Sequence, residues 1–187
     1  QEGFSEFIFS VNYLKEQIFD YFGDGSKWGV NINYLIEEKP LGTAGSLGLL
    51  PSGLEGPFFI SNGDVLTNFN PLNMLDFFNN NKAFSSLAVI KHEHNFQFGV
   101  VKIKGVELDG FEEKPTFVNY INAGIYIVDH KILQFLPKGE FFDMPSLFLK
   151  ARNSGYKIVT FPIDEYWLDI GHPDSLKKAN LDWFVKQ

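Results

Sequence analysis

Strand-like and helix-like segments alternate along most of this chain, and that alternation constrains its fold most strongly. Short runs rich in β-branched and aromatic residues predict strands, and amphipathic runs between them predict helices. The predicted strands are 7–13, 30–36, 57–61, 85–90, 157–163 and 166–170, and the predicted helices are 14–23, 71–81, 130–136, 144–153 and 173–185. This order predicts an α/β fold, a Rossmann-like and mostly parallel sheet with helices on both faces.

The alternation of strands and helices is interrupted between residues 98 and 128. Residues 98–103, 110–114 and 120–128 predict strands joined by turns, with no helix between them. This pattern predicts a small antiparallel insertion. The 187 residues suit one domain, 1–187, and contain no solenoid-like repeat.

The composition excludes several classes of function. The chain has no Cys, which removes disulfides, thiolate nucleophiles and Cys-based zinc sites, and is compatible with a cytoplasmic location. A formal charge of −7 argues against a nucleic-acid partner, because phosphate-backbone binding needs a basic surface. No apolar run is long enough for a membrane span, and no signal-peptide pattern is expected.

Two carboxylates follow apolar strands in similar settings. Asp64 stands in "SNGDVL" after the strand 57–61, and Asp169 stands in "WLDIGHP". Ligands of open α/β sheets bind beyond the carboxyl ends of the strands, and Mg²⁺ is usually held by one or two carboxylates plus phosphates and waters. The pair therefore predicts a Mg²⁺ site, with a simple Asn-Gly-Asp turn as the alternative for Asp64.

Three further segments carry candidate binding residues. "EEKPLGTAGSL" (37–47) is a glycine-rich turn whose N–H groups could bind a nucleotide or merely cap a helix. "FEEKP" (111–115) places Glu113 and Lys114 where a sugar and a phosphate could bind, or at a solvated strand end. "NAGIYI" (122–127) contains a glycine within a strand, which indicates either close approach of a ligand or a bulge.

Taken in order, these motifs resemble the sugar nucleotidyltransferase family, and most closely its mannose-1-phosphate guanylyltransferase-like members. The matching pieces are "LGTAGSL" (41–47), "SNGDVL" (61–66), "FGVV" (98–101), "EEKP" (112–115), "NAGIYI" (122–127) and "WLDIGHPDSLKKAN" (167–180). Single pieces are common, but six in the family's order over almost the whole chain are specific.

The resemblance implies that a nucleoside triphosphate reacts with a sugar 1-phosphate to give a nucleotide-sugar and pyrophosphate, with Mg²⁺ as cofactor. The sugar phosphate oxygen attacks the α-phosphorus in line, without a covalent enzyme intermediate. By motif, the resemblance assigns metal binding to Asp64 and Asp169 and a catalytic charge to Lys114. It assigns nucleotide binding to Glu37, Gly42, Thr43 and Gly63, and sugar binding to Gly99, Glu113, Asn122 and Gly124.

The nucleotide expected is GTP. Glu37 falls near where the family reads the base, and an ionised carboxylate accepts hydrogen bonds but cannot donate them. Guanine offers two adjacent donors, so Glu37 favours GTP over a pyrimidine nucleotide. Glu38 is an equally available neighbour.

One family motif is absent from the printed sequence. The family opens with a strand and a G-x-G-T-R loop that cradles the triphosphate, whereas residues 1–6 are expected to be the tail of a later helix. We expect a chain that lacks the family's first βα unit and is inactive by itself. The alternatives are a regulatory paralogue that binds nucleotide-sugars without turnover and, less well matched, a D-x-D transferase. A homo-oligomer is a possible assembly.

Overall fold

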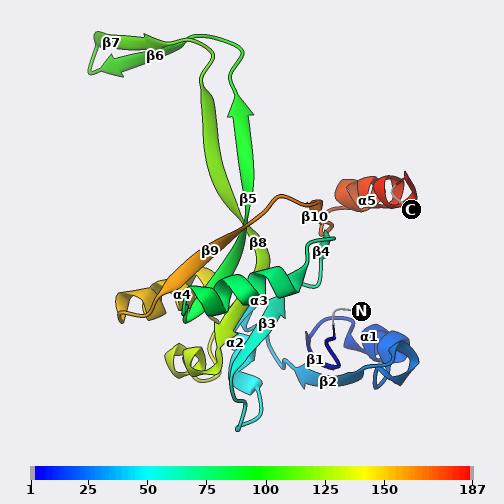
Figure 1. Ribbon diagram of the computed structural model, residues 1–187. Coiled ribbons are helices and arrows are strands. Elements are labelled where there is room, and N and C mark those ends of the chain that lie inside the picture. Colours follow the sequence, from blue (N-terminus) through cyan, green and yellow to red (C-terminus); the bar gives the residue numbers. More distant parts are fainter. Residues whose placement is uncertain (1–2, 186–187) are drawn as a thin grey trace. The chain divides into compact units, whose positions relative to one another are not determined.

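The computed structural model describes residues 3–185 and divides them between two compact units. The first unit contains 3–62, 70–86 and 126–159, and the second contains 63–69, 87–125 and 160–185. Strands and helices occur in mixed order in both (Figure 1).

The first unit begins with a parallel strand pair and a helix. β1 (Glu6–Val11) pairs with β2 (Asn31–Ile36), with Glu6 opposite Asn31 and Val11 opposite Ile36. The connection between them contains α1 (Lys15–Phe22), as parallel strands require a crossover. Phe9 and Phe19 both pack edge-to-face on Tyr34, which fixes α1 against the strand pair.

The rest of the first unit surrounds a buried core. It contains α2 (Gly42–Gly45), β3 (Pro57–Ser61), α3 (Pro71–Asn80) and α4 (Met144–Asn153). Each longer helix has a proline in its first two positions, after a capping residue: Asn70 accepts a hydrogen bond from Leu72 N, and Asp143 accepts one from Ser146 N. Its large, fully buried apolar side chains are Met74, Ile127, Val128, Ile132, Met144 and Leu147.

A four-stranded sheet has the order β3-β8-β5-β9. Its remaining members are β5 (Ser85–Asn95), β8 (Thr116–Asp129) and β9 (Ile158–Ile163). β5 and β8 are long strands, and each has a buried half and an exposed half. β8 is exposed over 116–122 and buried over 123–128.

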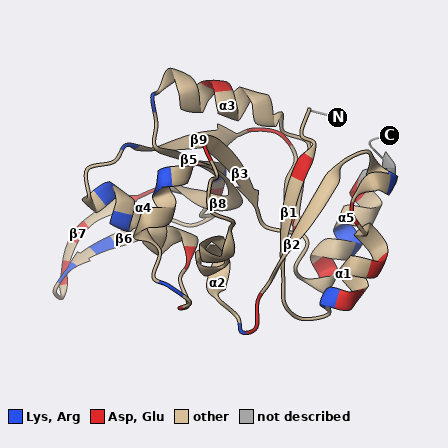
Figure 2. Ribbon diagram, turned by 90° about the horizontal axis from the view of Figure 1, so that it is seen from below, with Lys and Arg blue, Asp and Glu red and all other residues tan. Residues whose placement is uncertain are grey.

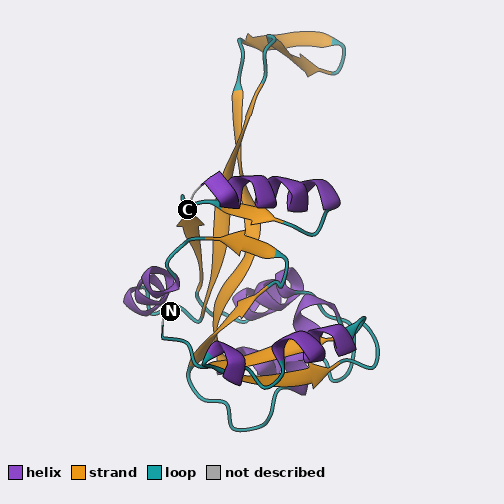
Figure 3. Ribbon diagram, turned by 90° about the vertical axis from the view of Figure 1, so that its right-hand side faces the viewer, coloured by secondary structure: helices purple, strands orange, loops and turns teal. Residues whose placement is uncertain are grey.

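The second unit contains two antiparallel pairs of short strands. β4 (Val65–Thr67) pairs with β10 (Trp167–Asp169), and β6 (Val100–Lys104) pairs with β7 (Glu107–Glu112). Figure 3 shows the exposed halves of β5 and β8 continuing as a two-stranded ribbon into the β6–β7 hairpin. The last helix is α5 (Pro173–Val185).

The α/β class and the antiparallel insertion are confirmed, and so are most element positions. The strand 57–61 and the helices 144–153 and 173–185 lie where they were predicted. The helical tail expected at residues 1–6 is wrong over 3–6, which form no helix, because Glu6 already begins β1; residues 1–2 lie outside the described part. β4 was not predicted, because three residues carry too little periodicity.

Within residues 3–185, no helix is long and apolar enough to cross a membrane.

Candidate active site

Asp64 and Asp169 lie beside each other at one end of the β4–β10 ladder. Asp64 occupies the turn between β3 and β4, and Asp169 ends β10 opposite Val65. The N–H of Ile170 donates to the Asp64 carbonyl at 2.8 Å, which extends the ladder by one bond. The pair converges because the start of one strand meets the end of an antiparallel neighbour, and not through parallel strand ends.

Gly171 lies between the two carboxylates. A Cβ placed on this glycine would lie 2.9 Å from Asp64 Oδ2 and 3.1 Å from Asp169 Oδ1. The N–H of Gly171 also donates to Asp169 Oδ1 at 2.9 Å. Both carboxylates therefore approach one point on the backbone, and any side chain at residue 171 would push against them. Both are exposed, so a solvent-borne ligand can reach them.

Three hydrogen bonds hold the strand that carries Asp169. The indole Nε1 of Trp167 donates to the Ala123 carbonyl at 2.9 Å, and Thr67 Oγ1 donates to the Tyr166 carbonyl at 2.7 Å. The Tyr166 hydroxyl donates to Asp182 Oδ2 on α5 at 2.9 Å. Burial, followed by this bond to Asp182, raises the pKa of Tyr166, so it remains a neutral donor.

The predicted sugar residues fall into two local groups in the second unit. A Cβ on Gly99 would lie 3.1 Å from Glu113 Oε2, so these two residues are neighbours. Lys114 has φ +45°, in the left-handed region that residues with a side chain rarely adopt, and it directly precedes Pro115. Backbone strain of this kind often occurs at ligand-binding positions.

The second group lies on β8 beside Trp167. Gly124 has φ +72° in the middle of the strand, and its N–H donates to Asn122 Oδ1 at 3.1 Å. Glycine adopts a positive φ readily, which accounts for a glycine at this position of β8. Because Trp167 bonds to the intervening Ala123, the tryptophan links this part of β8 to the strand of Asp169.

The glycine-rich turn of the first unit packs against its own chain. Gly42 has φ +78°, and a Cβ there would lie 2.6 Å from the Phe142 carbonyl oxygen. That carbonyl accepts from the N–H groups of Ala44 and Gly45, and Thr43 Oγ1 accepts from Met144 N at 2.9 Å. The sequence suggested ligand approach or a helix cap here, whereas the observed neighbour is the segment 140–144.

Glu37 is half-buried and fixed in place. Its Oε1 accepts from Ser10 Oγ at 2.6 Å, and its Oε2 accepts from Leu41 N at 2.9 Å. Glu38 is exposed. Since each carboxylate oxygen has a second acceptor position, Glu37 can still accept from a ligand, and its rigidity distinguishes it from Glu38.

The remaining candidate, Gly63, contributes less. Gly63 is exposed, and a Cβ there would meet nothing within 4 Å, so its turn is sterically open. The rings of His92 and His94 on β5 lie with their centroids 4.2 Å apart and their planes tilted by 54°. Over residues 3–185, no group of three or more His, Cys, Asp or Glu side chains could hold a metal ion by itself.

A two-carboxylate donor set fits Mg²⁺ only when the ligand supplies the other donors. Mg²⁺ commonly keeps several waters and binds through one or two carboxylates plus substrate phosphates. Asp64 and Asp169 supply the hard oxygen ligands that this mode needs, while a zinc ion would need further protein ligands. The site fits a metal that arrives with a phosphorylated ligand.

Comparison with known proteins gives the family directly. The family model "Nucleotidyl transferase" matches residues 1–184, and the chain therefore belongs to the nucleotidyl transferase family. The fold and the family resemblance predicted from the sequence motifs are thereby confirmed.

Curated relatives include mannose-1-phosphate guanyltransferases. That of Yarrowia lipolytica is 34% identical over 181 residues, covering 91% of this chain and 49% of the relative. The mannose-1-phosphate guanylyltransferase of Mycobacterium tuberculosis is 29% identical over 189 residues, covering 96% and 52%. This chain thus spans about half the length of the curated relatives it matches.

A solved structure supports the fold. HddC from Yersinia pseudotuberculosis superposes with a TM-score of 0.73 at 22% identity, covering 97% of this chain and 80% of that one.

Two residues of the site were missed from the sequence. Gly171 and Trp167 both lie in the motif that supplied Asp169, yet neither received a role. An Asp-x-Gly at a strand end was the available signal for Gly171. The bond from Trp167 to Ala123 spans a separation of 44 residues, and no local pattern reveals it.

Proposed function

We propose that this chain forms part of a sugar-1-phosphate nucleotidyltransferase that uses Mg²⁺ and favours GTP. A sugar phosphate oxygen forms a bond to the α-phosphorus of the triphosphate, and the bond to the leaving pyrophosphate breaks. The observation that carries the proposal is the convergence of Asp64 and Asp169 on Gly171. The family match and the guanylyltransferase relatives support it.

In this proposal Asp64 and Asp169 hold Mg²⁺ together with the phosphates. The bound ion would neutralise phosphate charge that otherwise repels the two substrates. Lys114 adds a positive charge for the sugar phosphate, and its left-handed backbone fixes the start of its side chain. Glu113, beside Gly99, accepts hydrogen bonds from sugar hydroxyls, and Asn122 and Gly124 complete the sugar contacts.

In the same proposal Glu37 selects guanine. Its carboxylate is already oriented by Ser10 and the Leu41 N–H, so little side-chain entropy is lost when it accepts from the two guanine donors. Gly42, Thr43 and Gly63 contribute backbone surface near the nucleotide. A Glu37→Gln variant that binds GTP and UTP equally would support this role. A variant that still prefers GTP as strongly as the unaltered chain would contradict it.

We also propose that the chain, which has no G-x-G-T-R segment in the printed sequence, turns over slowly by itself. Pyrophosphate release can be assayed with the chain alone and with a longer protein that contains such a segment. A large gain in the longer protein supports an enzyme. Nucleotide-sugar binding without turnover in both would instead support the regulatory alternative.

The binding half of the proposal is tested by calorimetric titration of GDP-mannose with and without Mg²⁺. We expect Mg²⁺-dependent binding that weakens at least about tenfold in Asp64→Asn and in Asp169→Asn, because each loses one hard ligand. Asp76→Asn, an exposed carboxylate on α3, is the matched control. Equal affinity in all four proteins would contradict the assignment of the two carboxylates.

A further inference from the structure

The segment between β3 and β4 contains the one Asn-Gly sequence of this chain, Asn62-Gly63. It directly precedes Asp64, and neither Asn62 nor Gly63 belongs to a strand or a helix. β3 carries no charged residue (Figure 2). The Asn62 amide is therefore a neutral group between an uncharged strand and the carboxylate of Asp64.

An Asn-Gly sequence favours attack of the main chain on the asparagine side chain. The nitrogen of the following residue attacks Cγ of the asparagine amide, and the five-membered ring that forms is a succinimide. A side chain on the following residue crowds this attack, and glycine has none. Asparagine is one of the thermolabile residues of proteins, and this reaction is a reason for its lability.

The structure leaves both reacting groups of Asn62-Gly63 available. Both residues are exposed, so water reaches them. Within residues 3–185, neither the Asn62 side-chain amide nor the Gly63 N–H has a hydrogen-bond partner. Ser61 Oγ donates to the Asn62 main-chain oxygen at 3.0 Å, but this bond involves neither the Gly63 nitrogen nor Asn62 Cγ.

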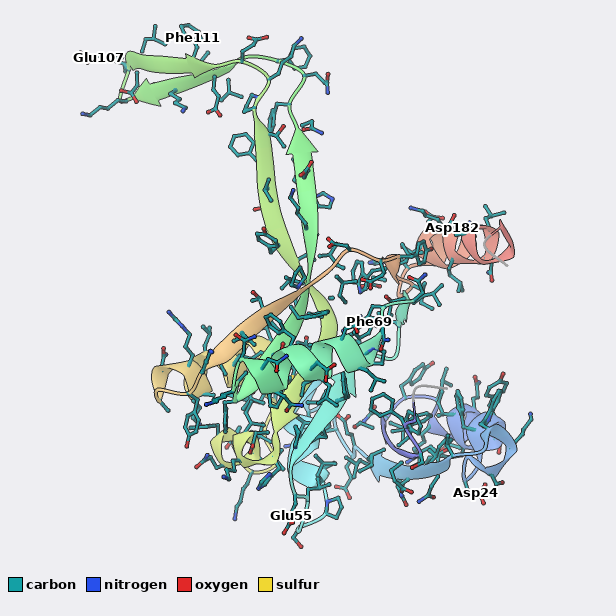
Figure 4. The ribbon with its side chains drawn as sticks, in the orientation of Figure 1. Asp24, Glu55, Phe69, Glu107, Phe111 and Asp182 are labelled. Atoms are coloured by element: carbon teal, nitrogen blue, oxygen red, sulfur yellow. The ribbon has the colours of Figure 1, made fainter. Side chains whose placement is uncertain are left out.

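Comparable sequences elsewhere in the chain lack this combination. In the two Asp-Gly sequences, the Gly25 N–H donates to a carbonyl at 3.1 Å, and Gly110 lies within β7. Their side chains are carboxylates, which are poorer electrophiles than an amide. Asn68 is exposed and lies outside strands and helices, as Asn62 does, but the bulky Phe69 follows it (Figure 4).

The fold does not require glycine at residue 63. The backbone of Gly63 is not left-handed, and a Cβ there would meet nothing within 4 Å. Alanine therefore fits at this position without strain or overlap. Gly63→Ala is thus a variant that hinders the attack and leaves the fold intact.

We propose that Asn62 is a site of spontaneous deamidation that alters the Asp64 site as the protein ages. The Gly63 nitrogen loses its proton and bonds to Asn62 Cγ, and the side-chain nitrogen leaves as ammonia. Water then opens the succinimide: attack at Cγ gives aspartate, and attack at the main-chain carbonyl gives isoaspartate. One water is consumed, one ammonia is released and one carboxylate is gained, with no change in oxidation state.

The isoaspartate product displaces Asp64. Its main chain runs through the former side chain, so the connection from β3 to Asp64 becomes longer by one bond of about 1.5 Å. Mg²⁺ demands near-ideal geometry, with ligands at about 2.0–2.1 Å, so a carboxylate displaced by this much no longer serves as a ligand together with Asp169. This consequence rests on the proposed function, whereas the deamidation itself does not.

Peptide mapping by mass spectrometry, on protein incubated at mildly basic pH, tests the deamidation. We expect an acid to replace the Asn62 amide before any other asparagine reacts, with isoaspartate detected by enzymatic methylation. Gly63→Ala is expected to slow the reaction at least about tenfold, because its Cβ crowds the attack. Asn68 is the matched control in the same map. A stable Asn62 amide, equal conversion at Asn68, or an unchanged rate in Gly63→Ala would each overturn the proposal.

Calorimetric titration of GDP-mannose with Mg²⁺, on fresh and aged protein, measures the consequence. We expect the fraction of protein that binds to fall in step with the isoaspartate content. Asn62→Gln, which would have to form a larger ring, is expected to keep its binding on ageing, and Asn62→Asp tests the added charge without the longer main chain. Full binding by protein rich in isoaspartate, or equal loss in aged Asn62→Gln, would contradict the effect on Asp64. Absence of binding by the fresh chain would contradict the proposed function alone, because the peptide map decides the deamidation.

Discussion

Gly42 and Gly171 both lie in segments assigned to ligand binding by the sequence, but they have different neighbours in the structure. A Cβ on Gly42 would meet the backbone oxygen of Phe142, whereas a Cβ on Gly171 would meet two carboxylates. Gly42 also requires a left-handed backbone, and Gly171 does not. The first glycine is needed by the fold, and the second keeps space beside the carboxylates of Asp64 and Asp169.

This difference separates stability from ligand binding. A main-chain oxygen in the ladder of bonds between Phe142, Ala44 and Gly45 cannot move without breaking those bonds. A carboxylate at the end of a short side chain can rotate away, and its affinity for a ligand then falls. Substitutions at the two glycines should therefore affect different measurements.

The largest expected effect is that of Gly42→Ala on stability. The alanine combines an unfavourable positive φ with a contact far below van der Waals distance, and we expect a loss of about 2–3 kcal/mol in the free energy of unfolding. Urea denaturation followed by circular dichroism measures it. Gly48→Ala, where a Cβ would meet nothing within 4 Å, is the control. A loss below the control's would show that the turn does not depend on this glycine.

The second effect is that of Gly171→Ala on metal binding. The added methyl displaces Asp64 and Asp169, so we expect Mg²⁺-dependent nucleotide-sugar affinity to fall about tenfold. Unfolding free energy should change little, because the backbone at residue 171 has no left-handed strain. Titration calorimetry and denaturation on the same sample compare the two. A stability loss as large as that of Gly42→Ala, with affinity retained, would reverse the comparison.

The smallest expected effect concerns Asp143, which caps α4. It directly follows Phe142, whose carbonyl accepts hydrogen bonds from the Gly42 turn. Hydrogen bonds from the Ser146 side chain and then from its N–H lower the pKa of Asp143. A lowered folded-state pKa gives stability that is present above the unfolded pKa of about 4 and is lost as pH falls through the lower folded value.

Asp143→Ala should therefore cost about 1 kcal/mol at neutral pH. Asp143→Asn retains the cap without titrating, so its stability relative to the unaltered chain should rise as the pH falls below about 4. Denaturation at several pH values checks both. A constant difference across this range would show that Asp143 does not titrate on unfolding.

Local patterns predicted most of the fold. Pro71 and Pro173 marked helix starts, and the apolar run 57–61 marked β3, because capping and periodicity are properties of a few adjacent residues. They also predicted that Asp64 and Asp169 lie together, although the antiparallel pairing that brings them together was not foreseen. The functional roles of the sugar and nucleotide residues remain predictions.

What the sequence could not reveal depends on distant partners. The Gly42 turn could bind a nucleotide or cap a helix, and nothing nearby in the chain indicates that residues 140–144 pack against it. The glycine of "NAGIYI" could have marked a ligand or a bulge, and its φ of +72°, which favours glycine there, is visible only in the structure. Backbone angles and contacts across a hundred positions are not encoded in short windows.

The β4–β10 ladder also sets when the carboxylate pair can form. Thr67 bonds to Tyr166 across 99 positions, and Asp169 and Gly171 lie still later in the chain. Closing so long a loop costs conformational entropy before any stabilising contact forms, so this non-local strand pairing is slow. Asp64 therefore meets Asp169 only once these two distant strands have paired. The carboxylate pair is thus a late product of folding, and the ligand binding proposed for it would report that β4 and β10 have paired.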